Sequence, residues 1–486
     1  MKRHSSTDSG KSGMVPAERR AVFSLASIYA LRMMGLFMIL PVFAIYGQTL
    51  KGYSPALVGI AIGIYGLTQA VLQIPFGMAS DHFGRKPVIT LGLILFAIGS
   101  AVAAMSHTMT GVIIGRAMQG AGAIAAAVMA LTADLTREEN RLGAMATIGI
   151  SIGFAFALSL VLGPLLNGLI GVPGIFWLTG VLSLVAIGVL HLVVPNPVHT
   201  RFHRDSSPVL SQFKTVITNT QLLRLDYGIL SLHMMLTATF TTLPLALRDH
   251  AGLATNHHWF VYLPVMALAM MLMVPFVIIA EKKRRMKTIF ISAILAMGIA
   301  EVVFMEFDTS LVGMIIGLMI YFIAFNILEA TLPSLIAKTA DPDKKGTAMG
   351  VYSSSQFFGA FIGGSLGGWL HGAVSMEAVF GLCAVIAVVW FLFAATMQNP
   401  RYLSSYLIRI GDISAEKARH LVGELTRITG VAEAVVIPED NVAYLKVDLH
   451  ALDKEALSKY SIEDETIAHM FEEEGMRGET ATEQSR

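Results

Sequence analysis

Long apolar runs separated by short polar connections constrain this chain more than any other feature. A helix needs about 20 mostly apolar residues to cross the hydrocarbon core of a bilayer. Twelve stretches of the sequence are long enough, and only 14% of the residues are charged, compared with about 25% in soluble domains. The pattern predicts an all-α membrane protein. The expected spans are approximately 21–47, 56–80, 87–106, 109–134, 142–170, 174–195, 222–248, 258–281, 287–306, 310–338, 346–372 and 375–397.

The basic residues alternate between the two sides of the predicted spans. The N-terminal segment, the even-numbered loops and the span ends beside them hold 21 Lys and Arg, whereas the odd-numbered loops hold only Lys51 and Arg248. Cytoplasmic loops of membrane proteins are enriched in Lys and Arg. We therefore expect a multi-pass membrane protein, with both termini and the loop around Asp81 in the cytosol.

The spans divide into two similar halves. A polar stretch with proline and serine follows the sixth span, and PFGMASDHFGRK from Pro75 is echoed by PFVIIAEKKRRMK from Pro275. Transporters with two such parallel repeats move one half against the other around a site near the bilayer midplane. The expected organisation is an N-terminal cytosolic segment (1–20), a first six-helix half (21–195), a cytosolic linker (196–221), a second six-helix half (222–397), a further domain (402–470) and a disordered tail (471–486).

The region after Pro400 has a different pattern. SYLIRI, VAEAVVI and VAYLKVDL alternate as strands do, AEKARHLVGELTRIT is amphipathic, and LDKEALSKY is typical of a second helix. This βαββα order predicts a small α+β domain of ferredoxin-like shape. Metal-binding domains of that shape carry CxxC after the first strand, where this chain has GDIS, so soft-metal binding is not expected.

Three motifs carry a family resemblance. GMASDHFGRKP, between the second and third spans, resembles the loop signature of the major facilitator superfamily, and GRAMQGAGAIAAA resembles its fourth-span motif. A partial match to the fifth-span antiporter signature comprises Gly163, Pro164 and Gly168, with Asn167 and Ser159 in place of glycines. The chain thus resembles the twelve-span drug:proton antiporters, which implies two six-helix halves that alternate access to a shared cavity.

The resemblance implies a latch in the loop between the second and third spans. In the family the loop aspartate meets the N-terminus of the eleventh span, whose helix dipole favours a carboxylate by about 0.3–2 kcal/mol. By position, Asp81 would face the region of Gly346 and Arg85 would pair with Asp134, favouring the outward-open state. The alternative is a solvated loop whose positive charges only set topology. The candidate latch residues are Gly77, Asp81, Gly84, Arg85, Lys86 and Asp134, with Glu281 and Arg285 in the second copy.

Charged groups within the predicted spans are the candidates for a substrate and proton cavity. Arg32 lies about 17 Å into the first span, and a charge at that depth is costly in lipid. Glu329 is our candidate proton carrier. For Arg32, Arg116 and Glu329 the alternative is a buried ion pair that fixes helix packing. For Arg116 it is also a structural tie within the first half, and for His233 it is a hydrogen-bonded core histidine. Asp226 and Glu301 lie near span ends, where interfacial solvation is expected. The candidate cavity residues are Arg32, Arg116, Gln119, His233, Asn326 and Glu329.

The sequence also limits the chemistry. It contains no Walker, haem or metal-binding motif, and its single cysteine, Cys383, excludes a disulfide within the chain. We expect no enzyme activity, no cofactor, no resident metal and no nucleic-acid partner. The expected partners are the lipid bilayer, protons and a small molecule, and the C-terminal domain is expected to regulate by packing on cytosolic loops or on a second copy of itself.

The predicted function is proton-coupled efflux of a lipophilic or amphipathic molecule by alternating access, with the efflux direction implied by the antiporter resemblance alone. Two alternatives remain open at this point. One is a metabolite symporter or uniporter on the same fold, because fold does not dictate cargo. The other is a membrane sensor or scaffold that acts through the C-terminal domain.

Overall fold

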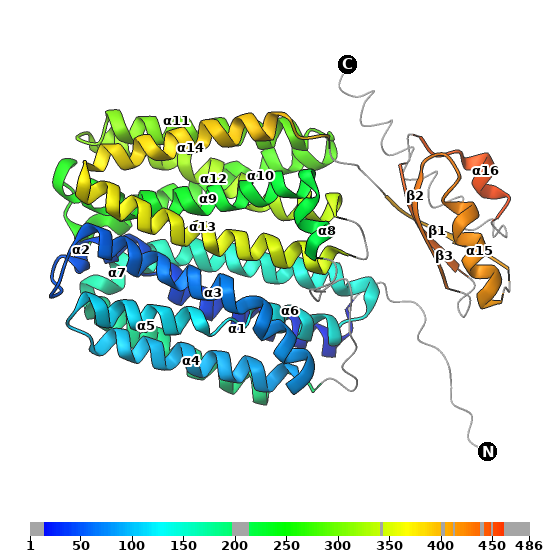
Figure 1. Cartoon of the computed structure of the whole chain (residues 1–486), viewed down its shortest axis with the longest axis horizontal. Coiled ribbons are helices and arrows are strands. Elements are labelled where there is room, and N and C mark those ends of the chain that lie inside the picture. Colours follow the sequence, from blue (N-terminus) through cyan, green and yellow to red (C-terminus); the bar gives the residue numbers. More distant parts are fainter. Residues whose placement is uncertain are drawn as a thin grey trace. The chain divides into compact units, whose positions relative to one another are not determined.

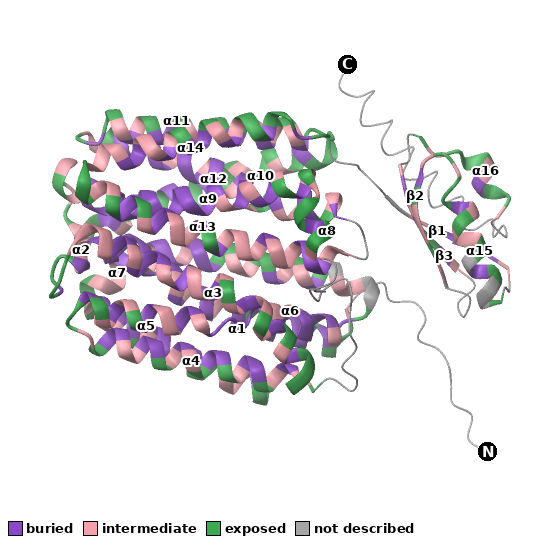
Figure 2. Cartoon of the chain, viewed as in Figure 1, coloured by how far each residue is buried: buried purple, intermediate pink, exposed green. Residues whose placement is uncertain are grey.

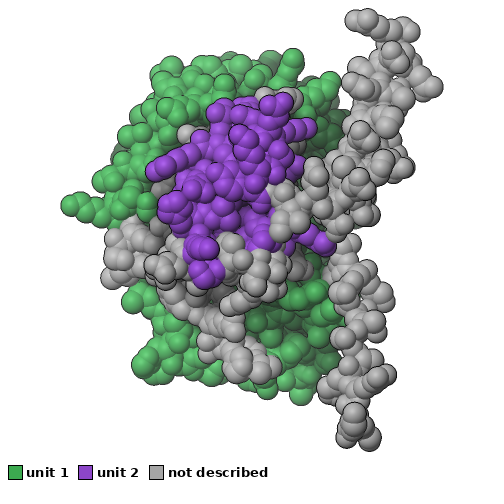
Figure 3. Space-filling view, turned by 90° about the vertical axis from the view of Figure 1, so that its right-hand side faces the viewer, with its two compact units in different colours: residues 1–400 green, residues 401–486 purple. Residues whose placement is uncertain are grey.

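The computed structural model describes residues 14–196, 213–340, 344–399, 404–411, 414–437, 442–448 and 451–460. They belong to two compact units, Met1–Pro400 and Arg401–Arg486, which Figure 3 colours separately. Helices build the first unit, and the second contains a small sheet. Residues 1–13, most of the predicted linker and the predicted tail lie outside the described residues.

The first half of the membrane unit is a succession of long helices (Figure 1). Their apolar composition allows burial in lipid, and helical hydrogen bonds satisfy the backbone there. The helices are α1 (Pro16–Phe37), α2 (Leu40–Gly47), α3 (Pro55–Phe83), α4 (Arg85–Met105), α5 (Met109–Ala121), α6 (Ala125–Asp134) and α7 (Glu138–Leu192).

The second half repeats this pattern after a short helix in the predicted linker. Its elements are α8 (Phe213–Thr218), α9 (Thr220–Leu245), the π-helix η2 (Ala246–His250), the 3₁₀-helix η3 (Thr255–His257), α10 (His258–Lys282), α11 (Met286–Glu306), α12 (Leu311–Thr339), α13 (Lys345–Ala373) and α14 (Met376–Ala395).

The described helices account for the twelve predicted spans. Ten segments are long and apolar enough to cross a membrane. One of them, Gly143–Leu192, holds two spans, because Gly171 breaks α7 with a φ of 68°. The remaining span is α13, whose glycines and serines lower its hydropathy although it is 29 residues long. The predicted all-α membrane fold is confirmed.

Glycine allows the backbones to approach closely where two spans bend. Gly122, in the break between α5 and α6, lies so close to Gly92 of α4 that a Cβ would overlap the Gly92 carbonyl. A Cβ on Gly163 would lie 2.5 Å from the Met38 carbonyl oxygen, in the break between α1 and α2. The bends therefore follow from backbone contacts that only small residues permit.

The two halves meet mainly through α3 and α13, which lie side by side between them (Figure 1). A Cβ on Gly63 would lie 2.8 Å from the Phe361 carbonyl oxygen, and one on Gly364 would lie 2.6 Å from the Gly59 carbonyl oxygen. The contact extends from Pro55, beside Gly372, towards the middle of both helices. Small residues let membrane helices approach at backbone distance, and here they hold the two halves together.

Burial separates helices of the interior from helices of the periphery (Figure 2). In the most apolar window of the segment Thr220–His250, 94% of the residues are buried, whereas in that of Thr255–Lys282 only 22% are. The α9 helix therefore lies inside the bundle. The exposed apolar residues of α10 are those expected to face lipid.

The second unit contains a three-stranded antiparallel sheet in the order β1-β3-β2. The strands are β1 (Ser404–Arg409), β2 (Val431–Ile437) and β3 (Val442–Val447), and the helices are α15 (Ala415–Leu425) and α16 (Lys454–Ser458). Buried residues of the strands and of α15 and α16, such as Leu445, Leu425 and Leu457, form its core. The order of elements confirms the predicted ferredoxin-like domain.

We predict that Gly59→Ala loosens the contact between the halves, because its Cβ would overlap the Gly364 carbonyl oxygen. Such overpacking costs about 1–3 kcal/mol. The measurement is the rate of disulfide cross-linking between Pro55→Cys and Gly372→Cys in a Cys383→Ser background, since a Cβ on Gly372 would lie 3.3 Å from the Pro55 Cβ.

The cross-linking rate should fall in Gly59→Ala. Gly188→Ala is the matched control, because a Cβ at Gly188 meets nothing within 4 Å. An unchanged rate in Gly59→Ala would contradict the assignment of this contact.

Candidate functional site

The loop between α3 and α4 forms a cluster of charges at one end of the first half. Arg85 donates from Nε to Asp134 Oδ2 at 3.1 Å and from Nη1 to Ser80 Oγ at 2.8 Å, and it also pairs with Asp81. The Arg85 side chain is 3% exposed and that of Asp81 is 28% exposed. The structure thus brings Arg85 and Asp134 together, while Asp81 is bound within its own half.

Glycine and lysine fix the shape of the same loop. Gly84 has a φ of 92°, which an L side chain rarely adopts. A Cβ on Gly77 would lie 3.1 Å from the Cβ of Ala126 in α6, so α3 and α6 pack closely. Lys86 donates to the Val194 carbonyl oxygen at 2.7 Å, just past the end of α7, where the helix dipole favours a cation. A gating role for these residues stays a prediction.

The second copy of the loop has different partners. Glu281 accepts from Lys338 Nζ at 2.6 Å and from Ser334 Oγ at 3.1 Å, both on α12. Arg285 is exposed and immediately precedes α11. Arg284 occupies the position equivalent to Gly84 and also has a positive φ, of 52°. The turn is therefore repeated, but the pairing of acid and arginine is not.

Arg116 is tied into the first half. It is fully buried and donates to the carbonyl oxygens of Ala61 and Ile62 on α3 and, at 3.0 Å, to Gln119 Oε1. Gln119 in turn donates to Ser100 Oγ at 2.8 Å. All three guanidinium nitrogens thus have acceptors. This arrangement matches a structural tie, and the cavity role of Arg116 and Gln119 stays a prediction.

Arg32 has fewer partners than Arg116. Its side chain is 1% exposed and donates to Gln69, which donates to Gln73 at 3.2 Å, while the Tyr65 ring lies 5.6 Å from the guanidinium carbon. Within the described residues, Nε and Nη1 of Arg32 have no hydrogen-bond partner. A buried charge with free donors is costly, so an acceptor from outside the protein would stabilise it.

The second half holds a polar cluster where α9, α12 and α13 meet. Gln356 Nε2 donates to Glu329 Oε1 at 3.3 Å and lies 2.8 Å from His233 Nε2, which itself lies 3.9 Å from Glu329 Oε2. The Glu329 side chain is 30% exposed. Glu329 Oε2 and Asn326 Nδ2 have no hydrogen-bond partner among the described residues. The predicted residues His233, Asn326 and Glu329 thus come from one region.

Aromatic rings lie beside this cluster and join the halves. Phe156 of α7 stacks on Phe325 of α12 with ring centroids 5.1 Å apart, and Phe37 of α1 packs edge-on against Phe156 at 4.9 Å. His233 lies 6.1 Å from the Phe325 ring. The midplane region therefore combines apolar surface with a few polar groups, as small-molecule sites do.

The expectation of interfacial solvation at Asp226 and Glu301 is wrong. Asp226 is 5% exposed and Glu301 is fully buried. Glu301 accepts from Thr239 Oγ1 at 2.8 Å, across from α11 to α9. Both acids lie near helix ends, but neighbouring helices cover them, which a single helix's hydropathy does not reveal.

The fifth-span motif has a packing role at one of its glycines. At Gly163, helix α7 lies close to the backbone of the break between α1 and α2. At Gly168, by contrast, an added Cβ would meet nothing within 4 Å. Pro164 lies within α7 and follows this close contact directly. The antiporter role of the motif stays a prediction.

Two amides were missed by the reasoning from the sequence. Gln69 and Gln356 connect Arg32 and Glu329, respectively, to their surroundings. Gln69 is followed by Gln73 four residues later, and Gln356 follows three serines; amides in such apolar or small-residue stretches were the available signal. Neither amide carries a charge, but its hydrogen bonds orient the charged group beside it.

Comparisons with known proteins agree on a family. The sequence profile of the Major Facilitator Superfamily matches residues 25–364 and again 283–407. Inner membrane transport protein YajR of Escherichia coli K12 is 48% identical over 436 residues, which cover 90% of this chain and 95% of that protein. Multidrug resistance protein MdtH of Aeromonas salmonicida is 25% identical, covering 73% of this chain and 88% of that protein.

A solved structure shares the fold. It is a bacterial homologue of the human lysosomal transporter Spinster in an inward-facing, unoccupied conformation, with a TM-score of 0.66 at 15% identity. The match covers 80% of this chain and 99% of the other.

We predict that Arg32→Gln and Arg116→Gln differ in their effect on stability. Arg116→Gln should lower the thermal unfolding midpoint of the detergent-purified protein, since unpaired buried acceptors cost about 1–3 kcal/mol each. Arg32→Gln should leave the midpoint unchanged or raise it, because it removes a buried charge with unpartnered donors. Equal losses in the two variants would contradict the distinction.

Proposed function

The chain belongs to the major facilitator superfamily, and from that premise we propose that it exports a lipophilic or amphipathic small molecule in exchange for protons. Its role as a multi-pass transporter of the inner membrane rests on the family and on the relative described above. The predicted resemblance is thereby confirmed. Proton coupling, efflux and the nature of the cargo are the proposal.

The observation that carries proton coupling is the position of Glu329. Its side chain is 30% exposed, and its carboxylate shares the Gln356 amide with His233. Protonation would remove its negative charge and change these hydrogen bonds. Gln356 directly precedes Phe357 of α13, whose carbonyl group packs on Gly66 of α3. A proton at Glu329 would therefore act next to the contact between the halves.

The proposed cargo class rests on the apolar and polar groups found within the two halves. Phe156 and Phe325 are buried aromatic rings stacked on each other, while Arg32 has two donors without a partner among the described residues. An amphipathic molecule would use both kinds of group. MdtH, a relative named for multidrug resistance, agrees with this proposal.

The state of the latch supports alternating access. The described contacts between the halves include Gln48 with Arg248 at 2.9 Å and Pro55 with Gly372. The charge pattern predicts that this end of the bundle faces the periplasm. The conformer would then be inward-facing, and Asp81 would be released from α13, as the proposed latch requires.

We predict that Glu329→Gln abolishes substrate-driven proton movement in proteoliposomes, because the amide carries no exchangeable charge. The assay imposes a pH gradient and follows lumenal pH while ethidium, rhodamine or decanoate is added. Glu306→Gln, at the exposed end of α11, is the matched control.

Proton movement that persists in Glu329→Gln would rule out this residue as the coupling site. Substrate movement without proton movement in the unmodified protein would instead favour a uniporter. If neither the substrate nor protons moved with any compound, a sensor acting through the C-terminal domain would gain support.

We predict that Asp81→Asn shifts the equilibrium towards the described conformer. The change removes the charge that the proposed contact with the α13 N-terminus needs, worth about 0.3–2 kcal/mol. In the described conformer Arg85 keeps Asp134 and Ser80, and it can still donate to the amide oxygen that replaces the Asp81 carboxylate. The cross-linking rate of the Pro55→Cys and Gly372→Cys pair should rise. Glu306→Gln, at the exposed end of α11, serves as the control, and equal rates in Asp81→Asn and the parent would remove the basis for the latch.

A further inference from the structure

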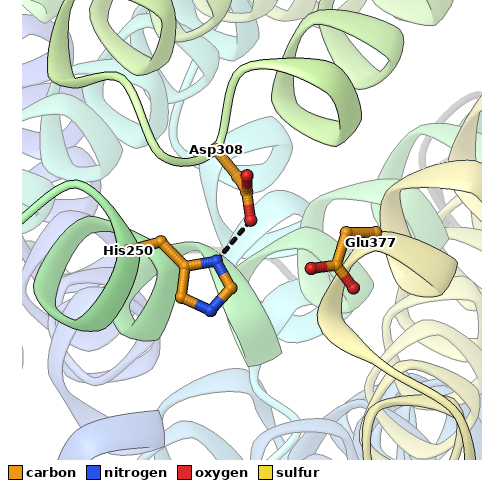
Figure 4. Close-up of side chains that lie close together, drawn as sticks. All are labelled: His250, Asp308 and Glu377. Atoms are coloured by element: carbon orange, nitrogen blue, oxygen red, sulfur yellow. Dashed lines mark hydrogen bonds and ion pairs between the residues drawn. The ribbon is translucent and has the colours of Figure 1, made fainter.

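Three potential metal ligands converge in the second half, away from the midplane cluster. His250 ends η2, Asp308 lies in the connection between α11 and α12, and Glu377 is in the first turn of α14 (Figure 4). Asp308 follows His250 by 58 positions in the sequence, and Glu377 follows Asp308 by 69. Such distances explain why no motif predicted the group, and why no resident metal was expected from the sequence.

The side chains face one another. Figure 4 shows His250 hydrogen-bonded through Nδ1 to Asp308, with the Glu377 carboxylate turned towards the pair. One donor atom from each residue lies within 4.8 Å of the other two. Ligand atoms around a tetrahedral metal with bonds of about 2.0–2.2 Å are roughly 3.5 Å apart. Small side-chain movements would therefore complete the geometry.

The charge of the cluster favours a cation. Two carboxylates and one imidazole share the space, and like charges close together are unfavourable. The nearest arginine along the chain, Arg248, is engaged elsewhere: it binds Asp249 at 2.6 and 2.8 Å and Gln48 at 2.9 Å. Asp308 is 7% exposed, whereas His250 and Glu377 are partly exposed, so an ion could reach the cluster from solvent.

We propose that His250, Asp308 and Glu377 form a binding site for a divalent transition metal, with one nitrogen and two oxygen ligands. Imidazole favours zinc and similar metals over magnesium and calcium, whereas carboxylates accept both groups. Zinc accepts this donor set with a water as a fourth ligand. The site does not depend on the proposed transport cycle.

The metal would connect three segments of the second half. It would fix His250 at the end of η2, two residues after Arg248, which reaches Gln48 of the first half. Binding of the metal should therefore also stabilise the contact between the halves at this end of the bundle. The site thus offers a route by which metal availability regulates the transporter.

The test uses the full chain, purified in detergent without a polyhistidine tag and stripped with a chelator. Zinc is titrated against a fluorescent zinc indicator, and the thermal unfolding midpoint is followed in parallel. We expect saturable binding of one zinc per chain and a higher midpoint. Glu377→Gln should weaken zinc binding by at least about tenfold while leaving the metal-free midpoint unchanged, because no hydrogen bond joins Glu377 to the His250–Asp308 pair.

Two further variants complete the design. Asp308→Asn should weaken zinc binding likewise, but it also removes the pairing with His250. In case Asp308→Asn does not fold, the result for Glu377→Gln is the decisive one. His420→Gln is the matched control, since the exposed His420 and Glu424 form another imidazole–carboxylate pair, 3.2 Å apart, with only two donors. Zinc binding should be retained there.

The proposal is overturned if the unmodified chain binds no stoichiometric zinc, or if Glu377→Gln binds it as tightly as the unmodified chain. Equal binding of magnesium, calcium and zinc would overturn the assignment of the imidazole as a ligand. Loss of zinc binding in His420→Gln would move the site to the C-terminal domain.

Discussion

The packing of α3 against α13 at backbone distance is the interaction on which the arrangement of the two halves depends. In lipid no hydrophobic force drives helices together, so close van der Waals contact and lipid entropy must do so. Gly59, Gly63 and Gly364 make that contact possible. The same glycines limit its strength, because they contribute no side chains that lock the halves. The contact can therefore hold one conformer without preventing its separation.

Polar groups are distributed unequally around this contact. In the first half, Arg116 and Gln119 satisfy one another and the α3 backbone, and they are suited to holding helices in place, whereas Arg32 keeps two donors without a partner among the described residues. In the second half, Glu329 and His233 share one amide and retain unpartnered atoms. Well-satisfied networks give rigidity, and partly satisfied ones can respond to a proton or a ligand. The two halves thus share a fold, but their buried polar groups are paired differently.

The sequence predicted the spans well because each one needs only its own apolar length, and the loop charges reinforced the count. It also predicted the C-terminal domain, whose strands and helix have distinct periodicities. It failed where several helices act together. Glu301 and Asp226 were placed at the interface because a single helix does not show what covers it, and the group of His250, Asp308 and Glu377 exists only after three distant segments meet.

The internal pairing of Asp81 has a further consequence. Arg85 pairs with this carboxylate in the described conformer. In the proposed latch, a move of Asp81 to α13 would therefore exchange one partner for another, and the carboxylate would not be left without a partner. Partner exchange of this kind lowers the activation barrier for a switch, since no step leaves a desolvated ion alone. It would also keep the free energies of the two conformers similar. A carrier that returns to its first conformer after every cycle needs this similarity, because a very stable conformer would slow the return.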